Sequence, residues 1–131
     1  MLQYLRQSKD AMIGFLDGFF AEALKDYASI NRWGPDALLR LREFASGGKM
    51  IRGGLVRFTH DMQGGKVPRD AAAAGAAMEL FQSAFLVHDD IMDRDMVRRG
   101  MPAVHAQYAS VCADENLRDA SHIGEALGIC A

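Results

Sequence analysis

Four aspartates followed by a pair of arginines stand within one short stretch, FLVHDDIMDRDMVRRG, residues 85–100. Asp89 and Asp93 are four residues apart, so on a helix they share one face, with their Cβ atoms roughly 5–6 Å apart. Asp90 flanks that face. A few carboxylates suit Mg²⁺, which completes its shell with water and substrate phosphates. The spacing therefore favours a magnesium site that receives a phosphorylated substrate, although a solvated acidic helix end has the same pattern.

Two groups of basic residues accompany the aspartates. Arg98 and Arg99 follow the acidic stretch, and guanidinium groups make paired hydrogen bonds to phosphate. Lys49 and Arg52 lie in GGKMIR, residues 47–52, where a glycine-rich loop opens a helix whose first N–H groups also attract anions. Taken singly, each group also fits a solvated surface or a helix stop. Together with the aspartates, they indicate a site for diphosphates.

The composition bounds the kind of protein. A chain of 131 residues, half of them hydrophobic, is long enough for one folded domain with its own core. Its net charge of −2 gives no reason to expect nucleic acid or an anionic membrane as a partner. No apolar run approaches the roughly 18 residues of a membrane span, and the first residues lack the apolar core of a signal peptide. Cys112 and Cys130 match neither a disulfide framework nor a metal pattern, so we expect packed thiols in a cytoplasmic protein.

The hydrophobic periodicity is helical throughout, and we find no strand alternation. Because its apolar faces are wide, the chain is expected to form an all-α helical bundle. Residues 123–131 follow a helical pattern that stops on apolar residues without a cap, so we expect residues 1–131 to be one helical domain, an incomplete part of a larger all-α catalytic domain. The expected helices are 2–27, a second with Pro35 in its first turn that stops at Gly47, 52–62, one from Pro68 through Ile91, 104–111, and one that begins near Asn116 or Ser121.

The segments GGKMIRG, ELFQSAFLVHDDIMD and RRGMP, in this order, carry a family resemblance. The chain resembles the amino-terminal part of the trans-isoprenyl diphosphate synthases, the polyprenyl synthetase family that includes farnesyl and geranylgeranyl diphosphate synthases. The similarity runs from about Phe44 to Ala131 and is most specific between Glu79 and Pro102. It implies the amino-terminal portion of the isoprenoid synthase fold, a homodimer, and Mg²⁺-dependent head-to-tail condensation of an allylic diphosphate with isopentenyl diphosphate.

The resemblance also implies a role for each charged group. Aspartates of the first aspartate-rich motif hold Mg²⁺ that bridges the allylic diphosphate, and the two arginines behind them divide the two diphosphates. Aspartates and arginines together are the implied catalytic residues, because they neutralise the charge that develops on the leaving diphosphate. The implied sets are Asp89, Asp90 and Asp93 for the metal, Arg98 for the allylic diphosphate, and Lys49, Arg52, Gln82 and Arg99 for isopentenyl diphosphate.

The chain departs from the family pattern at several places. Met50 and Gly53 stand where the family has an arginine and a proline, which predicts a less rigid loop. Gln82 stands where many members have histidine, but an amide can still donate a hydrogen bond. The second aspartate-rich motif is not found in these 131 residues, so we expect the isolated chain to be inactive.

The helix that carries the aspartates also offers a pocket for the hydrocarbon product. Phe85 lies one turn before Asp89 on the same face, Phe81 lies a further turn away, and Ala84 is small. In the family, bulk at these positions limits chain length, so the resemblance implies a C15 to C20 product, with C20 slightly favoured. His88 is expected to pack against another helix rather than to act as a base.

Three other functions compete with this one. A terpene cyclase also uses DDxxD but needs no second diphosphate site, which leaves GGK..R and RRG unexplained. The chain alone could also be a noncatalytic fragment or a modulatory subunit. An HD-type phosphohydrolase would use residues in the order H, HD, D, here His60, His88-Asp89 and Asp119.

Overall fold

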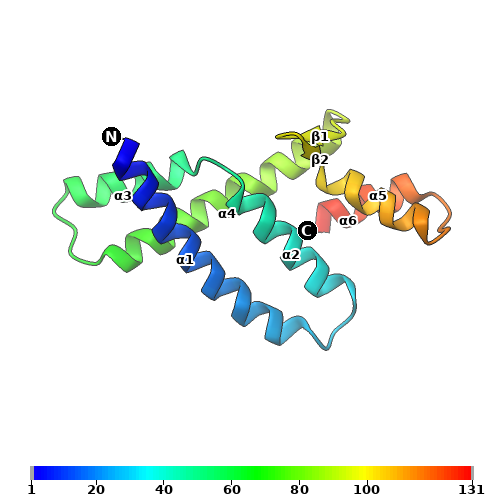
Figure 1. The fold of residues 1–131 in the computed structure, drawn as a ribbon, viewed down its shortest axis with the longest axis horizontal. Helices are drawn as coiled ribbons and strands as arrows, with labels where there is room; N and C mark the ends of the chain where they lie inside the picture. Colours follow the sequence, from blue (N-terminus) through cyan, green and yellow to red (C-terminus); the bar gives the residue numbers. More distant parts are fainter. Residues whose placement is uncertain (1, 131) are drawn as a thin grey trace. The chain divides into compact units, whose positions relative to one another are not determined.

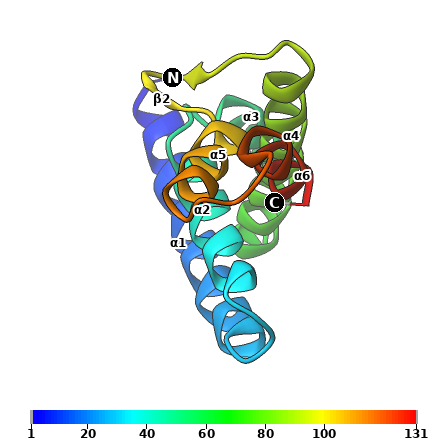
Figure 2. The ribbon, with the colours of Figure 1, turned by 90° about the vertical axis from the view of Figure 1, so that its right-hand side faces the viewer.

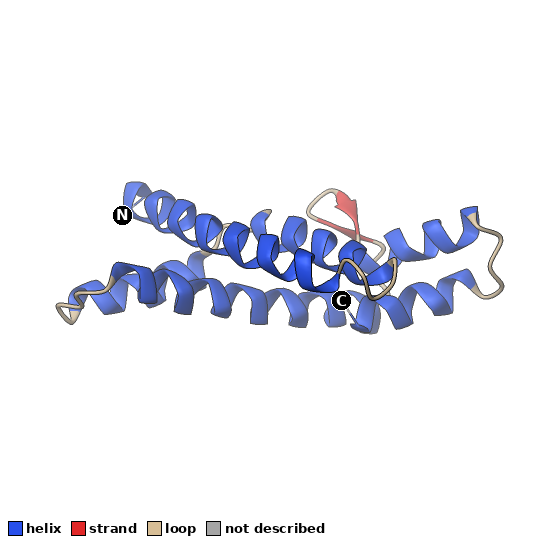
Figure 3. Cartoon of the chain, turned by 90° about the horizontal axis from the view of Figure 1, so that it is seen from below, coloured by secondary structure: helices blue, strands red, loops and turns tan. Residues whose placement is uncertain are grey.

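A computed structural model describes residues 2–130, and within them the chain forms six helices and one small hairpin (Figures 1 and 3). The elements divide into two compact units, an amino-terminal unit of residues 1–82 and a carboxy-terminal unit of residues 83–131. Helix α4 crosses the boundary between them. The elements are α1 (Leu2–Tyr27), α2 (Trp33–Ser46), α3 (Ile51–Met62), α4 (Pro68–Met92), β1 (Val97–Arg98), β2 (Met101–Pro102), α5 (Val104–Asp114) and α6 (Ala120–Cys130).

The core of the amino-terminal unit forms around one face of α1. Met12, Leu16 and Phe20 recur every four residues, and at most 1% of each is exposed. Met50 and Ala76 join them in one buried cluster. Helices α1 and α2 pack against each other, with the loop between them at one end (Figure 1). This apolar stripe explains why residues 2–27 form a helix, because its spacing matches the helical period.

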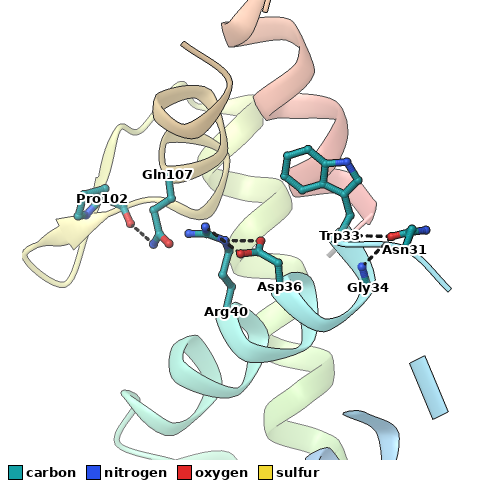
Figure 4. Close-up of polar contacts among 7 residues, drawn as sticks. All are labelled: Asn31, Trp33, Gly34, Asp36, Arg40, Pro102 and Gln107. Atoms are coloured by element: carbon teal, nitrogen blue, oxygen red, sulfur yellow. Dashed lines mark hydrogen bonds and ion pairs between the residues drawn. The ribbon is translucent and has the colours of Figure 1, made fainter. Parts of the chain in front are cut away.

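The start of α2 is capped by a side chain from the loop that precedes it. Asn31 Oδ1 accepts hydrogen bonds from the backbone N–H groups of Trp33, at 2.8 Å, and Gly34, at 3.0 Å (Figure 4). One turn further, Arg40 Nε donates to Asp36 Oδ2 at 2.8 Å. The cap satisfies N–H groups that have no partner within a first helical turn.

The carboxy-terminal unit contains the end of α4, the hairpin and the pair α5–α6, which lie side by side (Figure 2). Gly124 on α6 allows the close approach, because a Cβ there would lie 2.6 Å from the His105 carbonyl oxygen and 2.7 Å from Ala109 N. Tyr108 and Cys112 are buried on the same side of α5. Gln107 Nε2 donates to the carbonyl oxygen of Pro102 at 2.8 Å and so ties α5 to the hairpin (Figure 4).

The expected helices are confirmed, with ends that shift by a few residues. The hairpin was not expected, because strands of two residues are too short to show alternation. Cys112 is a buried thiol as predicted, but Cys130 is exposed, so the prediction of a packed thiol is wrong there. None of the helices in residues 2–130 is long and apolar enough to cross a membrane.

Candidate active site

Two of the aspartates form an exposed pair at the end of α4. Asp89 and Asp93 are both exposed. The backbone N–H of Asp93 donates to the carbonyl oxygen of Asp89 at 2.8 Å, so the helical phase continues to Asp93 although α4 ends at Met92. The two carboxylates therefore lie one turn apart on one face, as their spacing predicts.

The third aspartate lies in a different environment. Asp90 is 0% exposed, and its Oδ1 accepts a hydrogen bond from Arg98 Nε at 2.7 Å and a second, shorter one from Arg98 Nη2. No donor within residues 2–130 reaches its other oxygen, Oδ2. The hydrogen bonds to Asp90 raise the pKa of Arg98, and Asp95 and Asp89 act in the same direction. Asp90 thus fixes an arginine that the resemblance assigns to the allylic diphosphate.

Arg94 and Asp95 close the helix in a Schellman arrangement. Arg94 adopts the left-handed conformation, with φ 58°, and its N–H donates to Ile91 O at 3.3 Å. The N–H of Asp95 donates to Asp90 O at 2.8 Å. Its side-chain Oδ2 lies 3.9 Å from Arg98 Nη2. Asp95 has no role in the sequence-based assignments, and here it helps to end α4 and adds negative charge beside Arg98.

A tight hairpin presents the two arginines. Val97 pairs with Pro102 and Arg98 with Met101, so Arg99 and Gly100 form the two-residue turn. Both have positive φ, 55° for Arg99 and 79° for Gly100, as a type I′ turn requires. Glycine accepts this conformation freely, but an arginine in it is uncommon. The hairpin therefore holds Arg98 on a strand, against Asp90, and places Arg99 at the tip.

The glycine-rich loop in the amino-terminal unit is held by the hydrophobic core and by two hydrogen bonds. Met50 takes the left-handed conformation, with φ 51°, and is 2% exposed within the core cluster. Lys9 Nζ donates to the carbonyl oxygen of Gly48 at 2.9 Å. The backbone N–H of Gly53 donates to Glu79 Oε1 at 2.7 Å. Core packing and two tethers therefore hold this loop where the family has a proline, and the expectation of a less rigid loop stays a prediction.

Lys49 and Arg52 are exposed on either side of the buried Met50. They are thus available to a ligand, while the buried Met50 anchors the loop. Gln82 is half-buried on α4, three residues after Glu79 and so on a neighbouring turn of the same face. Because Glu79 bonds the first turn of α3, this face of α4 is the one that meets the loop.

Phe81, Ala84 and Phe85 lie on a solvent-exposed part of α4. Phe81 is 62% exposed and Phe85 is 55% exposed. The two phenylalanines are four residues apart and share one side of the helix. An apolar surface of this kind on a helix that also carries the aspartates is suited to hydrocarbon.

The donor set at the end of α4 fits Mg²⁺ rather than a closed metal cage. Residues 2–130 contain no group of three or more His, Cys, Asp or Glu side chains that could hold a metal ion. Mg²⁺ keeps several of its waters and takes further oxygen ligands from a substrate. Two exposed carboxylates one turn apart suit such an ion. Beside this pair, Oδ2 of Asp90 is a further buried oxygen, and no hydrogen-bond donor within residues 2–130 reaches it.

The histidines offer no support for an HD-type phosphohydrolase. His60 Nδ1 lies 3.0 Å from Asp61 Oδ1, and Tyr4 donates its hydroxyl hydrogen to Asp61 Oδ2 at 2.7 Å. His88 Nε2 lies 3.4 Å from the carbonyl oxygen of Ile129 on α6. His60 therefore belongs to a surface network, and His88 lies against α6, as expected.

Sequence reasoning missed two residues of these clusters, Glu79 and Gly75. Glu79 is 8% exposed. The sequence does offer a signal for it, because an acidic residue stands in an otherwise apolar helical segment. Gly75 lies in the middle of an alanine-rich helix, where a glycine without a packing reason weakens the helix. Both residues contact Gly53, which lies more than twenty positions earlier.

Comparison with known proteins agrees with this geometry. A sequence model of the polyprenyl synthetase family matches residues 40–114. A short chain isoprenyl diphosphate synthase of Methanothermobacter thermautotrophicus is 45% identical over 87 residues, which cover 65% of this chain and 26% of that protein. A geranylgeranyl diphosphate synthase of Sulfolobus acidocaldarius is 49% identical over 65 residues, 50% of this chain and 19% of that one. The chain thus spans about a quarter or less of these relatives.

A solved structure shows the same arrangement of helices. Geranylgeranyl pyrophosphate synthase from Corynebacterium glutamicum, complexed with isoprenyl diphosphate and magnesium, superimposes with a TM-score of 0.76 at 27% identity. The match covers 98% of this chain and 37% of that protein. The expected fold, the amino-terminal portion of the isoprenoid synthase fold, is confirmed.

Proposed function

Because the chain belongs to the polyprenyl synthetase family, we propose that the protein containing it is a short-chain isoprenyl diphosphate synthase. It joins an allylic prenyl diphosphate head-to-tail with isopentenyl diphosphate. The observation that carries the proposal is the exposed pair Asp89 and Asp93 beside an arginine that Asp90 holds in place. A pair of acids and a fixed cation together suit a metal-bound diphosphate.

The reaction proceeds by loss of diphosphate from the allylic substrate, whose C–O bond breaks with both electrons on oxygen. The double bond of isopentenyl diphosphate forms the new C–C bond to the resulting cation, and a proton then leaves. The chain needs no nucleophile for this chemistry. Arg98 binds the leaving diphosphate and stabilises its developing charge, and Asp90 and Asp95 hold that guanidinium in position before the substrate arrives.

Asp89 and Asp93 are the residues that would hold Mg²⁺, and the direct coordination of metal by Asp90 stays a prediction. When bound, the ion neutralises negative charge on the allylic diphosphate. Arg99 at the hairpin tip, together with Lys49, Arg52 and Gln82, is proposed to bind isopentenyl diphosphate. The exposed positions of Lys49 and Arg52, in a loop that Lys9 bonds at Gly48, support this assignment.

The proposed product contains 15 to 20 carbons. Phe85 and Phe81 would limit the growing chain, and Ala84 leaves room beside Phe85. If this is correct, Phe85→Ala lengthens the product, as thin-layer or mass-spectrometric analysis of the dephosphorylated prenols would show, whereas Ala84→Phe shortens it. An unchanged product distribution in both variants would contradict the assignment.

Assembly as a homodimer and location in the cytoplasm belong to the same proposal. The family resemblance supports both. Size-exclusion chromatography with light scattering measures the first, and fractionation of cells measures the second.

The decisive experiment measures prenyl transfer with radiolabelled isopentenyl diphosphate, an allylic diphosphate and Mg²⁺. We expect incorporation that needs both substrates and that chelation of Mg²⁺ abolishes. Product formed from the allylic diphosphate alone would indicate a terpene cyclase instead.

Residues 1–131 alone are the subject of a second proposal. They lack a second aspartate-rich motif, which supports a noncatalytic fragment or a modulatory subunit. Turnover by a preparation that mass spectrometry shows to contain only these residues would overturn it.

A further inference from the structure

We propose that Glu79 is a positioning residue for Lys49, Arg52 and Gln82, three residues of the proposed isopentenyl diphosphate site. This inference rests on the proposed function. Its side chain is 8% exposed, and Oε1 accepts the backbone N–H of Gly53 at 2.7 Å. Gly53 follows directly after Arg52, one of the two basic side chains that residues 47–52 contribute to the proposed isopentenyl diphosphate site. Glu79 acts on the substrate through this loop and not by contact with it.

The position of Gly53 in α3 explains why the hydrogen bond matters. Helix α3 begins at Ile51, so Gly53 is its third residue, and its N–H has no acceptor within the helix. A carboxylate there makes a charge-assisted hydrogen bond and also lies at the positive end of the helix. The bond therefore fixes the first turn of α3, the turn that carries Arg52.

Two glycines let the carboxylate reach this turn. A Cβ on Gly53 would lie 2.5 Å from the carbonyl oxygen of Gly75 and still closer to Met12 Sδ. A Cβ on Gly75 would lie 2.8 Å from the carbonyl oxygen of Gly53. The backbones of α3 and α4 therefore meet directly, and Glu79 lies one turn beyond Gly75 on α4, beside the first turn of α3.

The same contact brings Gln82 into register with the basic residues. Glu79 and Gln82 are three residues apart on α4, so they lie on neighbouring turns of one face. A bond from Glu79 to the start of α3 thus sets the distance between the loop and the amide of Gln82. Residues from α3 and α4 are ordered together before a ligand binds, which lowers the entropy lost on binding.

Other tethers hold the opposite end of the loop. Lys9 Nζ bonds the carbonyl oxygen of Gly48, and Met50 is buried in the core. Of these three anchors, Glu79 is the one whose side chain bonds the backbone N–H of Gly53, directly after Arg52. Its removal should therefore release Arg52 while Gly48 and Met50 remain in place.

The test compares Glu79→Ala with Glu79→Gln in the whole protein that contains residues 1–131, by calorimetric titration with isopentenyl diphosphate. We expect Glu79→Ala to weaken binding about tenfold, because a charged hydrogen bond that orders the site is lost. Glu79→Gln should stay within about threefold of the wild type, because its amide oxygen can still accept from Gly53. In ¹⁵N-labelled protein, the Gly53 amide proton should move upfield in Glu79→Ala and much less in Glu79→Gln.

A stability control separates positioning from unfolding. Phe20→Leu removes volume from the buried face of α1, eight residues after Met12, the α1 residue that lies against Gly53, and it should leave the affinity unchanged. The inference fails if Phe20→Leu weakens binding as much as Glu79→Ala does, or if Glu79→Ala binds like the wild type. If the wild type binds neither isopentenyl diphosphate nor inorganic diphosphate, the proposed function itself fails.

Discussion

Arg98 makes both of its hydrogen bonds to Asp90 through a single carboxylate oxygen of a side chain that solvent does not reach. The arginine and the aspartate are eight residues apart, on β1 and on the last turns of α4. One motif thus contains exposed acids for a metal and a buried acid for a cation. The division depends on which side of α4 each aspartate faces and on the hairpin, which brings Arg98 against Asp90.

Asp90→Ala should lower the free energy of unfolding by about 2–3 kcal/mol, because a buried charged partner of Arg98 is lost. Urea denaturation followed by circular dichroism measures this. Asp93→Ala is the matched control, with an expected change within about 0.5 kcal/mol, since its side chain is exposed. Equal effects of the two substitutions would mean that the buried pair adds nothing to the stability of the fold.

Arg94→Gly should stabilise the chain by about 0.5–1 kcal/mol, because Arg94 caps α4 in the left-handed conformation that glycine adopts without a steric penalty. Asn116 caps α5 with φ 56°, and asparagine tolerates this conformation better. Asn116→Gly should therefore change the stability less. A loss of stability in Arg94→Gly would show that the arginine side chain contributes more than the cap geometry costs.

Gly53→Ala and Gly18→Ala should act in opposite directions. Alanine at 53 would collide with Gly75 and Met12, and this overpacking should cost about 1–3 kcal/mol. A Cβ on Gly18 would meet no other part of residues 2–130 within 4 Å, so alanine there should stabilise α1 by about 0.5–1 kcal/mol. The difference in thermal midpoint between the two variants is the measurement, and shifts of the same sign would contradict the prediction.

The surface network of Tyr4, His60 and Asp61 should give the stability a dependence on pH at both extremes. Hydrogen bonds from His60 and then Tyr4 lower the pKa of Asp61 below its usual 3.8. The resulting stability is present above pH 3.8 and is lost as the pH falls through the lowered folded value. Desolvation, followed by the hydrogen bond to Asp61, raises the pKa of Tyr4 above 10.0. That contribution is present below pH 10.0 and is lost as the pH rises through the folded value.

Tyr4→Phe tests both ends of this range. Its stability deficit relative to the wild type should be largest between the two pH extremes and should shrink toward each of them. Absorbance at about 295 nm, where tyrosinate absorbs, should lose in Tyr4→Phe a component that titrates above pH 10.0. A deficit that stays constant with pH would rule out the network as its source.

Much of the fold could be predicted from local signals. The stripe Met12, Leu16 and Phe20 predicts α1, and Gly64 marks the end of α3. The exposed placement of Asp89 and Asp93 on one face likewise follows from helical spacing alone. These features depend on residues within one or two turns of each other, where the sequence carries direct information.

Features that depend on distant residues could not be predicted in this way. The burial of Asp90 requires the hairpin to fold back, and its two-residue strands give no periodic signal. The contacts of Gly53 with α4 are made by Glu79 and Gly75, which lie 26 and 22 positions after Gly53 along the sequence. A sequence pattern reports what lies within one element, whereas these contacts join two.

The close approach of Gly53 and Gly75 also limits how this loop can be exchanged by engineering. A graft of the usual family loop would place proline at 53, without an N–H for Glu79, and arginine at 50, where the side chain is buried. The loop is therefore not interchangeable with the corresponding loop of the family. It would have to be transferred together with Met12, Gly75 and Glu79, so the smallest portable part of this site spans three helices.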